Sequence, residues 1–281
     1  MIYAADQAAG LRTREESSLI PLRRRAFRGP AWTLAVTSGK GGVGKTQLAA
    51  NIGAALASRG LQVLLLDADL GLASLDLALG LQPKSDLRAV LRGEASIEDI
   101  AVRGPMGLKL IPACPGRYDM ANLGPAERSR LIQAVHEAAE NYDVLLIDTG
   151  AGIGSNAVYF ASAADEILLT TTPDPTALRD AYAMVKILHR RASVDRIKLV
   201  ANMVHTALEG AELHARIDAI VTRFLSLDLD FLGSVPWDKE VAKGARRGRP
   251  HVLEAPLAPA SRAVLGLAAR LREQRRLEVA C

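Results

Sequence analysis

The chain has few aromatic residues and almost no cysteine. Aromatic residues make up 4% of its 281 residues, and its two cysteines, Cys114 and Cys281, form no Cys-x-x-Cys pair. Paired cysteines commonly bind zinc or iron–sulfur centres, or form the disulfide bonds that stabilise small secreted proteins. We therefore expect a cytoplasmic protein in a reducing compartment, without a cysteine-bound metal centre.

Long apolar runs are also absent. No stretch approaches the roughly 20 apolar residues of a membrane-spanning helix, and the N-terminal segment lacks the apolar region of a secretory signal. Hydrophobic residues nevertheless make up 49% of the chain. This content is consistent with one α/β domain of about 230 residues between two tails.

Charge is unevenly distributed along the chain. Residues 1–30 carry a net charge of +3 and residues 243–281 carry +6. Because the whole chain carries +4, the segment between them carries −5. Basic ends on an acidic core indicate either anionic partners, such as an acidic membrane surface or nucleic acid, or simply solvated tails.

The most specific motif is a glycine-rich string at residues 39–46. It reads Gly-Lys-Gly-Gly-Val-Gly-Lys-Thr and fits G-x-x-x-x-G-K-[ST], the phosphate-binding P-loop. A strand-like run at 32–37 precedes it and a helical pattern at 46–58 follows, as the motif requires. We expect ATP or ADP here, with Lys45 on the β- and γ-phosphates and Thr46 on Mg²⁺. The predicted nucleotide-binding residues of this segment are Gly39, Lys40, Gly41, Gly42, Val43, Gly44, Lys45, Thr46 and Gln47.

Two further apolar runs end in carboxylates. The first, at 62–67, leads into Asp67 and Asp69, and the second, at 143–148, ends in Asp148 before a glycine-containing loop. Carboxyl ends of buried parallel strands meet at the ligand-binding edge of an α/β sheet. The second run therefore predicts a Walker B strand, whose Asp148 holds Mg²⁺ through water.

The remaining segments alternate between strand and helix, which predicts a mostly parallel twisted sheet with helices on both faces. We expect a tail at 1–30, an ATPase domain at 31–260 and a C-terminal helix at 261–281. The strand-like runs are 32–37, 62–67, 107–111, 143–148, 166–171, 197–202 and 230–235. The helical runs are 46–58, 86–91, 125–140, 174–190, 208–224, 239–246 and 261–277.

Later strand ends supply candidates for a nucleobase pocket. Asn202 ends one run, and its amide offers the donor and the acceptor that an adenine edge requires. Pro236 and Asp238 follow the last run and could form a wall of the same pocket. An ordinary turn is the alternative for each of these residues.

Lys40, the extra lysine of the P-loop, resembles the signature of the MinD/ParA family of dimerising ATPases. The resemblance runs from Trp32 to about Leu271. It implies that Lys40 crosses the interface of an ATP-bound homodimer and acts in catalysis with Lys45. It also implies that Asp69 orients the attacking water and that Asp67 lies near the metal.

Further strings resemble the flagellar-number regulators of the FleN/FlhG (YlxH) group. They include Thr-Pro-Asp-Pro-Thr-Ala-Leu at 172–178 and Arg-Arg-Gly-Arg-Pro at 246–250. The segment Asp-Gln-Ala-Ala-Gly-Leu-Arg at 6–12 resembles the element with which these regulators bind FlhF, a GTPase of the signal-recognition-particle type. The resemblance implies that Asp6, Gln7, Leu11 and Arg12 bind such a partner and stimulate its GTP hydrolysis. A flagellar transcription regulator or a C-ring component is a further implied partner.

The C-terminal helix leaves two alternatives open. Its apolar positions include 264, 265, 267, 268 and 271, and its basic positions are 270, 272, 275 and 276. Such a helix could pack on the domain, or it could bring the protein to the anionic inner face of the cell membrane.

We expect a slow regulatory ATPase. The alternative function is a ParA- or MinD-type ATPase of DNA partition or division-site placement, although the element at 6–12 argues against DNA.

Overall fold

The computed structural model describes residues 31–114 and 116–280, and within them eight strands form a single sheet in the order β3-β4-β2-β5-β1-β6-β7-β8. The strands are β1 (Trp32–Ser38), β2 (Val63–Ala68), β3 (Val102–Arg103), β4 (Lys109–Ile111), β5 (Val144–Ala151), β6 (Glu166–Thr171), β7 (Ile197–Val204) and β8 (Asp230–Pro236). Only the pairing of β3 with β4 is antiparallel among them. The predicted α/β class with a mostly parallel sheet is confirmed.

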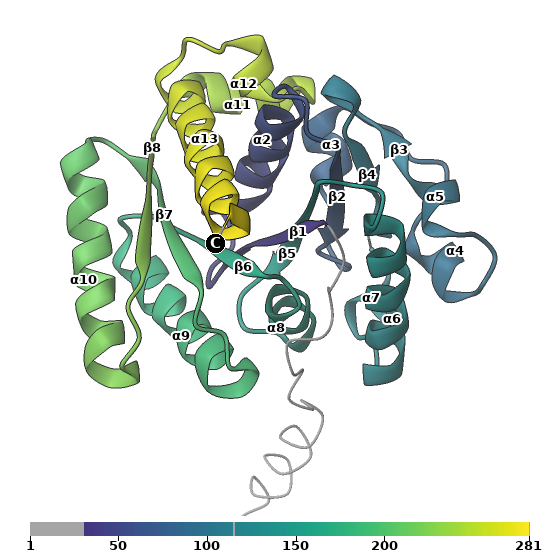
Figure 1. Cartoon of the computed structure of the whole chain (residues 1–281), viewed down its shortest axis with the longest axis horizontal. Coiled ribbons are helices and arrows are strands. Elements are labelled where there is room, and N and C mark those ends of the chain that lie inside the picture. The colour runs from purple at the N-terminus through teal and green to yellow at the C-terminus, as the bar shows by residue number, and fades with distance from the viewer. Residues whose placement is uncertain (1–30, 115, 281) are drawn as a thin grey trace, which may run out of the picture.

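Helices cover both faces of this sheet (Figure 1). The longer helices are α2 (Lys45–Ala57), α7 (Pro125–Ala139), α8 (Ser155–Ser162), α9 (Pro175–Ala192), α10 (Ala207–Leu225), α11 (Lys239–Arg247) and α13 (Pro259–Ala280). The short ones are α3 (Leu75–Leu79), α4 (Leu87–Leu91), α5 (Ile97–Ile100), α6 (Tyr118–Ala121), α12 (His251–Glu254) and the 3₁₀ turn η1 (Pro105–Gly107).

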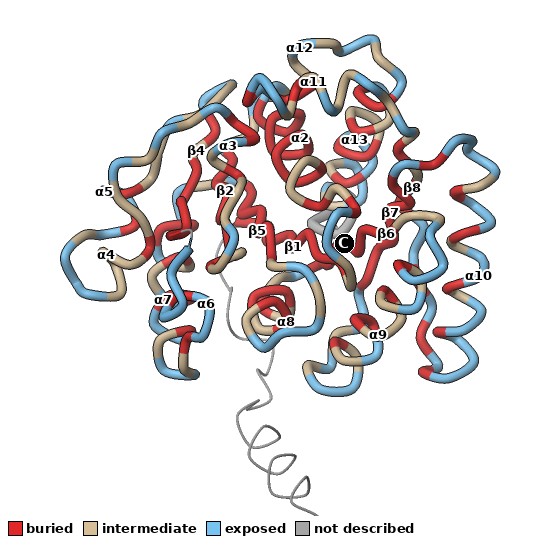
Figure 2. Tube along the Cα trace, turned by 180° about the vertical axis from the view of Figure 1, so that it is seen from behind, coloured by how far each residue is buried: buried red, intermediate tan, exposed pale blue. Residues whose placement is uncertain are grey.

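The core consists of two mainly aliphatic layers, one on each face of the sheet. Helices α2 and α13 pack with α3 and α12 on one face, and α7 to α10 pack on the other. Figure 2 shows the buried residues concentrated in the strands and on the inner sides of these helices. Helix α2 is almost wholly buried because it lies between the sheet and α13, which explains why its sequence is rich in alanine.

The C-terminal helix α13 packs on the domain. Val264, Leu267, Ala268 and Leu271 are at most 1% exposed, and they contact the layer formed by α2 and β8. Of the two alternatives open for this helix, the structure therefore shows packing, and these apolar side chains are not available to lipid. No helix in the described part of the chain has the length and apolarity required to traverse a bilayer.

Several elements differ from the sequence predictions. Helices α3, α5, α6, α8 and α12 and strand β3 were not expected, and the run predicted at 107–111 forms a strand only from Lys109. These elements contain two to eight residues, too few to display a period along the sequence. The longer elements match their predicted ranges within about three residues.

Candidate functional site

The glycine-rich loop connects β1 to α2, as predicted. Gly42 and Gly44 have φ angles of 80° and 84°, in the left-handed region that glycine adopts most readily. Gly44 is the N-cap of α2 and has no side chain to bind the first-turn N–H groups. Those donors, together with the positive end of the helix dipole, can therefore bind phosphate. The cleft beside the loop has a volume of about 480 Å³.

Close packing, rather than backbone conformation, requires glycine at position 39. A Cβ atom at this position would lie 2.0 Å from the carbonyl oxygen of Asp180 in α9. Gly39 thus allows α9 to approach the start of the loop closely, rather than supplying an unusual backbone conformation.

Lys45 and Asp148 form a buried ion pair at the centre of the cleft. The Lys45 Nζ atom lies 2.7 Å from Asp148 Oδ1, and the two side chains are 7% and 0% exposed. Among the described residues, the second oxygen, Asp148 Oδ2, is buried without a hydrogen-bond partner, and the Thr46 hydroxyl also contacts this carboxyl group. Burial raises the pKa of Asp148, although the Lys45 ammonium opposes that shift.

Asp67 and Asp69 lie beside this pair at the end of β2. Both oxygens of Asp67 accept backbone N–H groups, from Asp69 at 3.1 Å and from Ser74 and Leu75 at 3.0 Å. Burial, and then repulsion from Asp148, raise the pKa of Asp67 to about 7. Asp67 therefore organises the loop that carries Asp69, while its metal role stays a prediction. Asp69 is half-buried, and one oxygen accepts the N–H of Leu72 at 3.2 Å.

Lys40 points out of the phosphate cleft toward α9. Its Nζ atom donates to Asp174 Oδ1 at 3.3 Å and to the Thr176 hydroxyl, and both members of the ion pair are partly exposed. Asp174 is also the N-cap of α9, where its carboxylate accepts the N–H groups of Thr176 and Ala177. A hydrogen bond from the Thr176 hydroxyl, these N–H groups and the Lys40 contact hold the pKa of Asp174 well below its usual range. Sequence reasoning did not identify this partner of Lys40.

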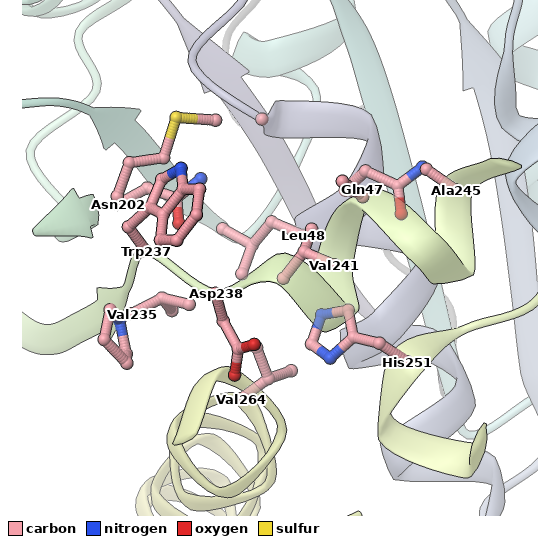
Figure 3. A pocket seen from close by; sticks show the side chains of 14 residues that line it. Gln47, Leu48, Asn202, Val235, Trp237, Asp238, Val241, Ala245, His251 and Val264 are labelled. Atoms are coloured by element: carbon pink, nitrogen blue, oxygen red, sulfur yellow. The ribbon is translucent and has the colours of Figure 1, made fainter. Parts of the chain in front are cut away.

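A second, largely apolar pocket of about 250 Å³ adjoins the first and shares Gly44 and Gln47 with it (Figure 3). The structure brings Asn202, Pro236 and Asp238 together in its wall. Asn202 Nδ2 donates one of its two N–H groups to the carbonyl oxygen of Val43 at 2.7 Å, so its second N–H and its amide oxygen remain for a ligand. The expectation that this amide presents both a donor and an acceptor to a base stays a prediction.

Asp238 forms part of the wall, and its carboxylate is hydrogen-bonded within the protein. Its two oxygens accept the N–H groups of Glu240 at 2.9 Å and Ala260 at 3.1 Å, so it caps α11 and anchors the start of α13. Trp237 and His251 line the same pocket. His251 was missed because nothing in its local sequence indicates a site.

The predicted partner-binding residues Asp6, Gln7, Leu11 and Arg12 lie outside the described residues. Their role stays a prediction from the resemblance alone.

Comparison with known proteins agrees with this geometry. The family model described as ParA, NUBPL iron-transfer P-loop NTPase, matches residues 31–272. The chain is 41% identical over 242 residues to the antiactivator FleN of Pseudomonas aeruginosa, with 86% of each chain covered. It is 38% identical over 205 residues to the flagellum site-determining protein YlxH of Helicobacter pylori, covering 72% of this chain and 68% of that one.

Among solved structures, the septum site-determining protein MinD of Pyrococcus horikoshii, complexed with Mg-ADP, matches with a TM-score of 0.72 and 25% identity. The match covers 86% of this chain and 96% of the archaeal one. The chain therefore belongs to the MinD/ParA family of P-loop NTPases, within the group that contains FleN and YlxH.

Proposed function

We propose that this protein is an ATP-dependent dimerising switch that regulates flagellar number. The observation that carries the proposal is the pair of lysines in one P-loop. Lys45 is buried inside the phosphate cleft, and Lys40 is partly exposed on its outer side. The similarity to FleN and YlxH supports the flagellar role.

The residues of the cleft fit a nucleotide with Mg²⁺. Asp148 Oδ2 is buried and has no hydrogen-bond partner among the described residues, and the Thr46 hydroxyl contacts this carboxyl group. Mg²⁺ is usually held by one or two carboxylates or hydroxyls together with substrate phosphates and water. When bound, the ion would neutralise charge on the β- and γ-phosphates. Thr46 and Asp148 would hold it, and Asp67 would support the loop next to it.

ATP binding would exchange the partner of Lys45. The Lys45 ammonium would leave Asp148 for the β- and γ-phosphates, and Asp148 would become available to the metal. Asp69, on the loop held by Asp67, would orient the attacking water. A single positioned carboxylate and a rearranging loop suit slow turnover, in which hydrolysis times the switch.

Dimerisation would use the face that contains the phosphate cleft. Leu72 and Leu77 line this cleft and are 78% and 67% exposed. Exposed apolar side chains around a charged cleft are typical of an interaction surface. Lys40 would leave Asp174 and bind phosphate held by the partner subunit, and such exposed ion pairs are easily exchanged because they are weak.

The test measures binding and association separately. Wild type and Lys40→Ala are titrated with a fluorescent ATP analogue, and their size is followed by light scattering with ATP or ADP. We expect ATP-specific dimerisation of the wild type and monomeric ATP binding by the variant. ATP binding without any association of the wild type would refute the switch.

The proposed flagellar partner is an FlhF-type GTPase that binds the N-terminal tail through Asp6, Gln7, Leu11 and Arg12. A peptide of residues 1–20 should stimulate GTP hydrolysis by the matching GTPase, and Gln7→Ala or Arg12→Ala should weaken the effect. Pull-downs with ATP-loaded and ADP-loaded protein would test a flagellar transcription regulator or a C-ring component. If the peptide leaves the GTPase rate unchanged, this partner assignment is wrong.

DNA partition or division-site placement is the alternative, since related proteins include the septum site-determining protein MinD of Bacillus subtilis. ATP-dependent, salt-sensitive DNA binding would favour partition. Peripheral contact with an anionic membrane would have to involve a surface other than the buried face of α13. Co-sedimentation with anionic vesicles tests that contact.

A further inference from the structure

His251 occupies an unusually well-anchored position in the wall of the second pocket. The N–H of the next residue, Val252, donates to Asn51 Oδ1 at 3.1 Å, which attaches α12 to the P-loop helix α2. The carbonyl oxygen of His251 accepts the Ser261 hydroxyl at 3.0 Å, which attaches it to α13. Gly244 lets α11 approach the same segment closely, because a Cβ atom there would lie 3.3 Å from the backbone nitrogen of His251. Three helices thus hold this residue against the pocket.

The same contacts determine which imidazole nitrogen carries the proton. His251 Nδ1 lies 2.8 Å from Ser261 Oγ, and that hydroxyl already donates its only hydrogen to the His251 carbonyl. The hydroxyl must therefore accept a hydrogen bond from Nδ1–H. In the neutral imidazole, Nε2 then carries a lone pair and acts only as an acceptor. Burial lowers the pKa of His251 to about 4, so the ring is neutral near pH 7.

Other polar side chains of the pocket already form hydrogen bonds within the protein. One N–H of Asn202 and both carboxylate oxygens of Asp238 form hydrogen bonds within the protein. Gln47 lines both the second pocket and the phosphate cleft, whereas His251 lines only the second pocket. His251 therefore lies at the end of the pocket away from the phosphate cleft. Figure 3 shows its ring in the pocket wall, with Val241 and Val264 near it. Among the described side chains that line this pocket, the Asn202 oxygen and His251 Nε2 can each accept a hydrogen bond from a ligand.

We propose that His251 is a specificity-determining residue whose Nε2 accepts a hydrogen bond from the exocyclic amino group of adenine. Guanine and hypoxanthine carry a carbonyl oxygen at this position, which would face the lone pair of Nε2. Ser261 is a positioning residue, because it fixes the tautomer without lining the pocket. This inference rests on the proposed function, in which ATP is the ligand.

The test compares three triphosphates that differ at purine position 6: ATP with an amino group, purine riboside triphosphate with hydrogen, and inosine triphosphate with a carbonyl group and a hydrogen on N1. Dissociation constants are measured by calorimetry on the full chain, without turnover. For the wild type we expect purine riboside triphosphate to bind about tenfold more weakly than ATP, as one lost hydrogen bond implies, and inosine triphosphate more weakly still.

The variants separate base recognition from packing. His251→Phe keeps an aromatic ring without the acceptor, and it should bind ATP and purine riboside triphosphate equally. His251→Gln keeps an acceptor and should retain a preference for ATP. Ser261→Ala should lose discrimination against inosine triphosphate, because the freed ring can then present an N–H to the carbonyl group. His189→Phe, on the outer side of α9, is the matched control and should leave all ratios unchanged.

Each contrary result has a distinct meaning. Equal wild-type affinity for ATP and purine riboside triphosphate would overturn the assignment, whatever the variants do. An equal loss of all three ligands in His251→Phe would show that the residue only packs, and would also overturn it. Failure of the wild type to bind any of the three would refute the proposed ATP switch, and this assignment with it.

Discussion

Replacing Lys45 by methionine should weaken the ligand-free fold as well as nucleotide binding. Asp148 is completely buried, and Lys45 Nζ at 2.7 Å is the only cation that contacts it in the described structure. Methionine has a similar length and fills the space, so the main loss is the positive charge. Removing one partner of a buried ion pair leaves the other charge uncompensated and typically costs about 3–5 kcal/mol.

A second consideration limits this cost. Asp148 can escape the penalty by taking up a proton, and neutralising a carboxyl group of ordinary pKa 3.8 at pH 7 requires about 4 kcal/mol. We therefore expect Lys45→Met to lower the free energy of unfolding by about 3–4 kcal/mol at pH 7. At pH 5 the same neutralisation requires only about 2 kcal/mol. Because a carboxyl whose folded pKa is raised loses stability as pH rises, the penalty should be smaller at pH 5.

Urea unfolding of the nucleotide-free protein, followed by circular dichroism at both pH values, measures this difference. The double variant Lys45→Met/Asp148→Asn should recover most of the lost stability, yet neither variant should bind ATP. Lys84→Met, at an exposed position, is the matched control. A penalty below about 1 kcal/mol at pH 7, or no recovery in the double variant, would refute the argument from a buried unpaired charge.

Four further substitutions test other parts of the site. Lys40→Ala should bind a fluorescent ATP analogue normally but hydrolyse no ATP, and normal hydrolysis by this variant would contradict the cross-subunit role. Asp69→Ala should accumulate as an ATP-bound dimer in light scattering because it hydrolyses slowly; a monomer with ATP would exclude the water-orienting role. Asp174→Asn preserves the N-cap of α9 but removes the charge that holds Lys40, so it should dimerise at lower protein concentration than the wild type; unchanged association would show that this contact does not restrain Lys40. His251 has a folded pKa of about 4, below its ordinary 6.5, so its contribution to stability is lost as pH falls through this interval. The wild type should therefore lose about 3 kcal/mol more than His251→Phe between pH 6.5 and pH 4 in urea unfolding, and parallel losses would contradict the shift.

The amino-acid sequence alone determined the main features of the fold and the phosphate site. The P-loop is a local motif, and its order of strand, loop and helix is visible within about 25 residues. Apolar runs that end at Asp67 and Asp148 predicted acids at one sheet edge, and both lie there. Elements too short to show a period, such as α3 and α12, could not be recognised in the same way.

The tertiary structure decided which groups meet. Lys45 pairs with Asp148, 103 residues away, and Lys40 with Asp174, 134 residues away. The apolar face of α13 packs on α2 and β8, whereas its sequence would equally allow this face to bind a membrane. His251 acquires its acceptor role only because Ser261 of α13 lies against it. Sequence patterns report local backbone preference and burial, whereas the protonation and partner of a polar group depend on neighbours that only the folded chain brings together.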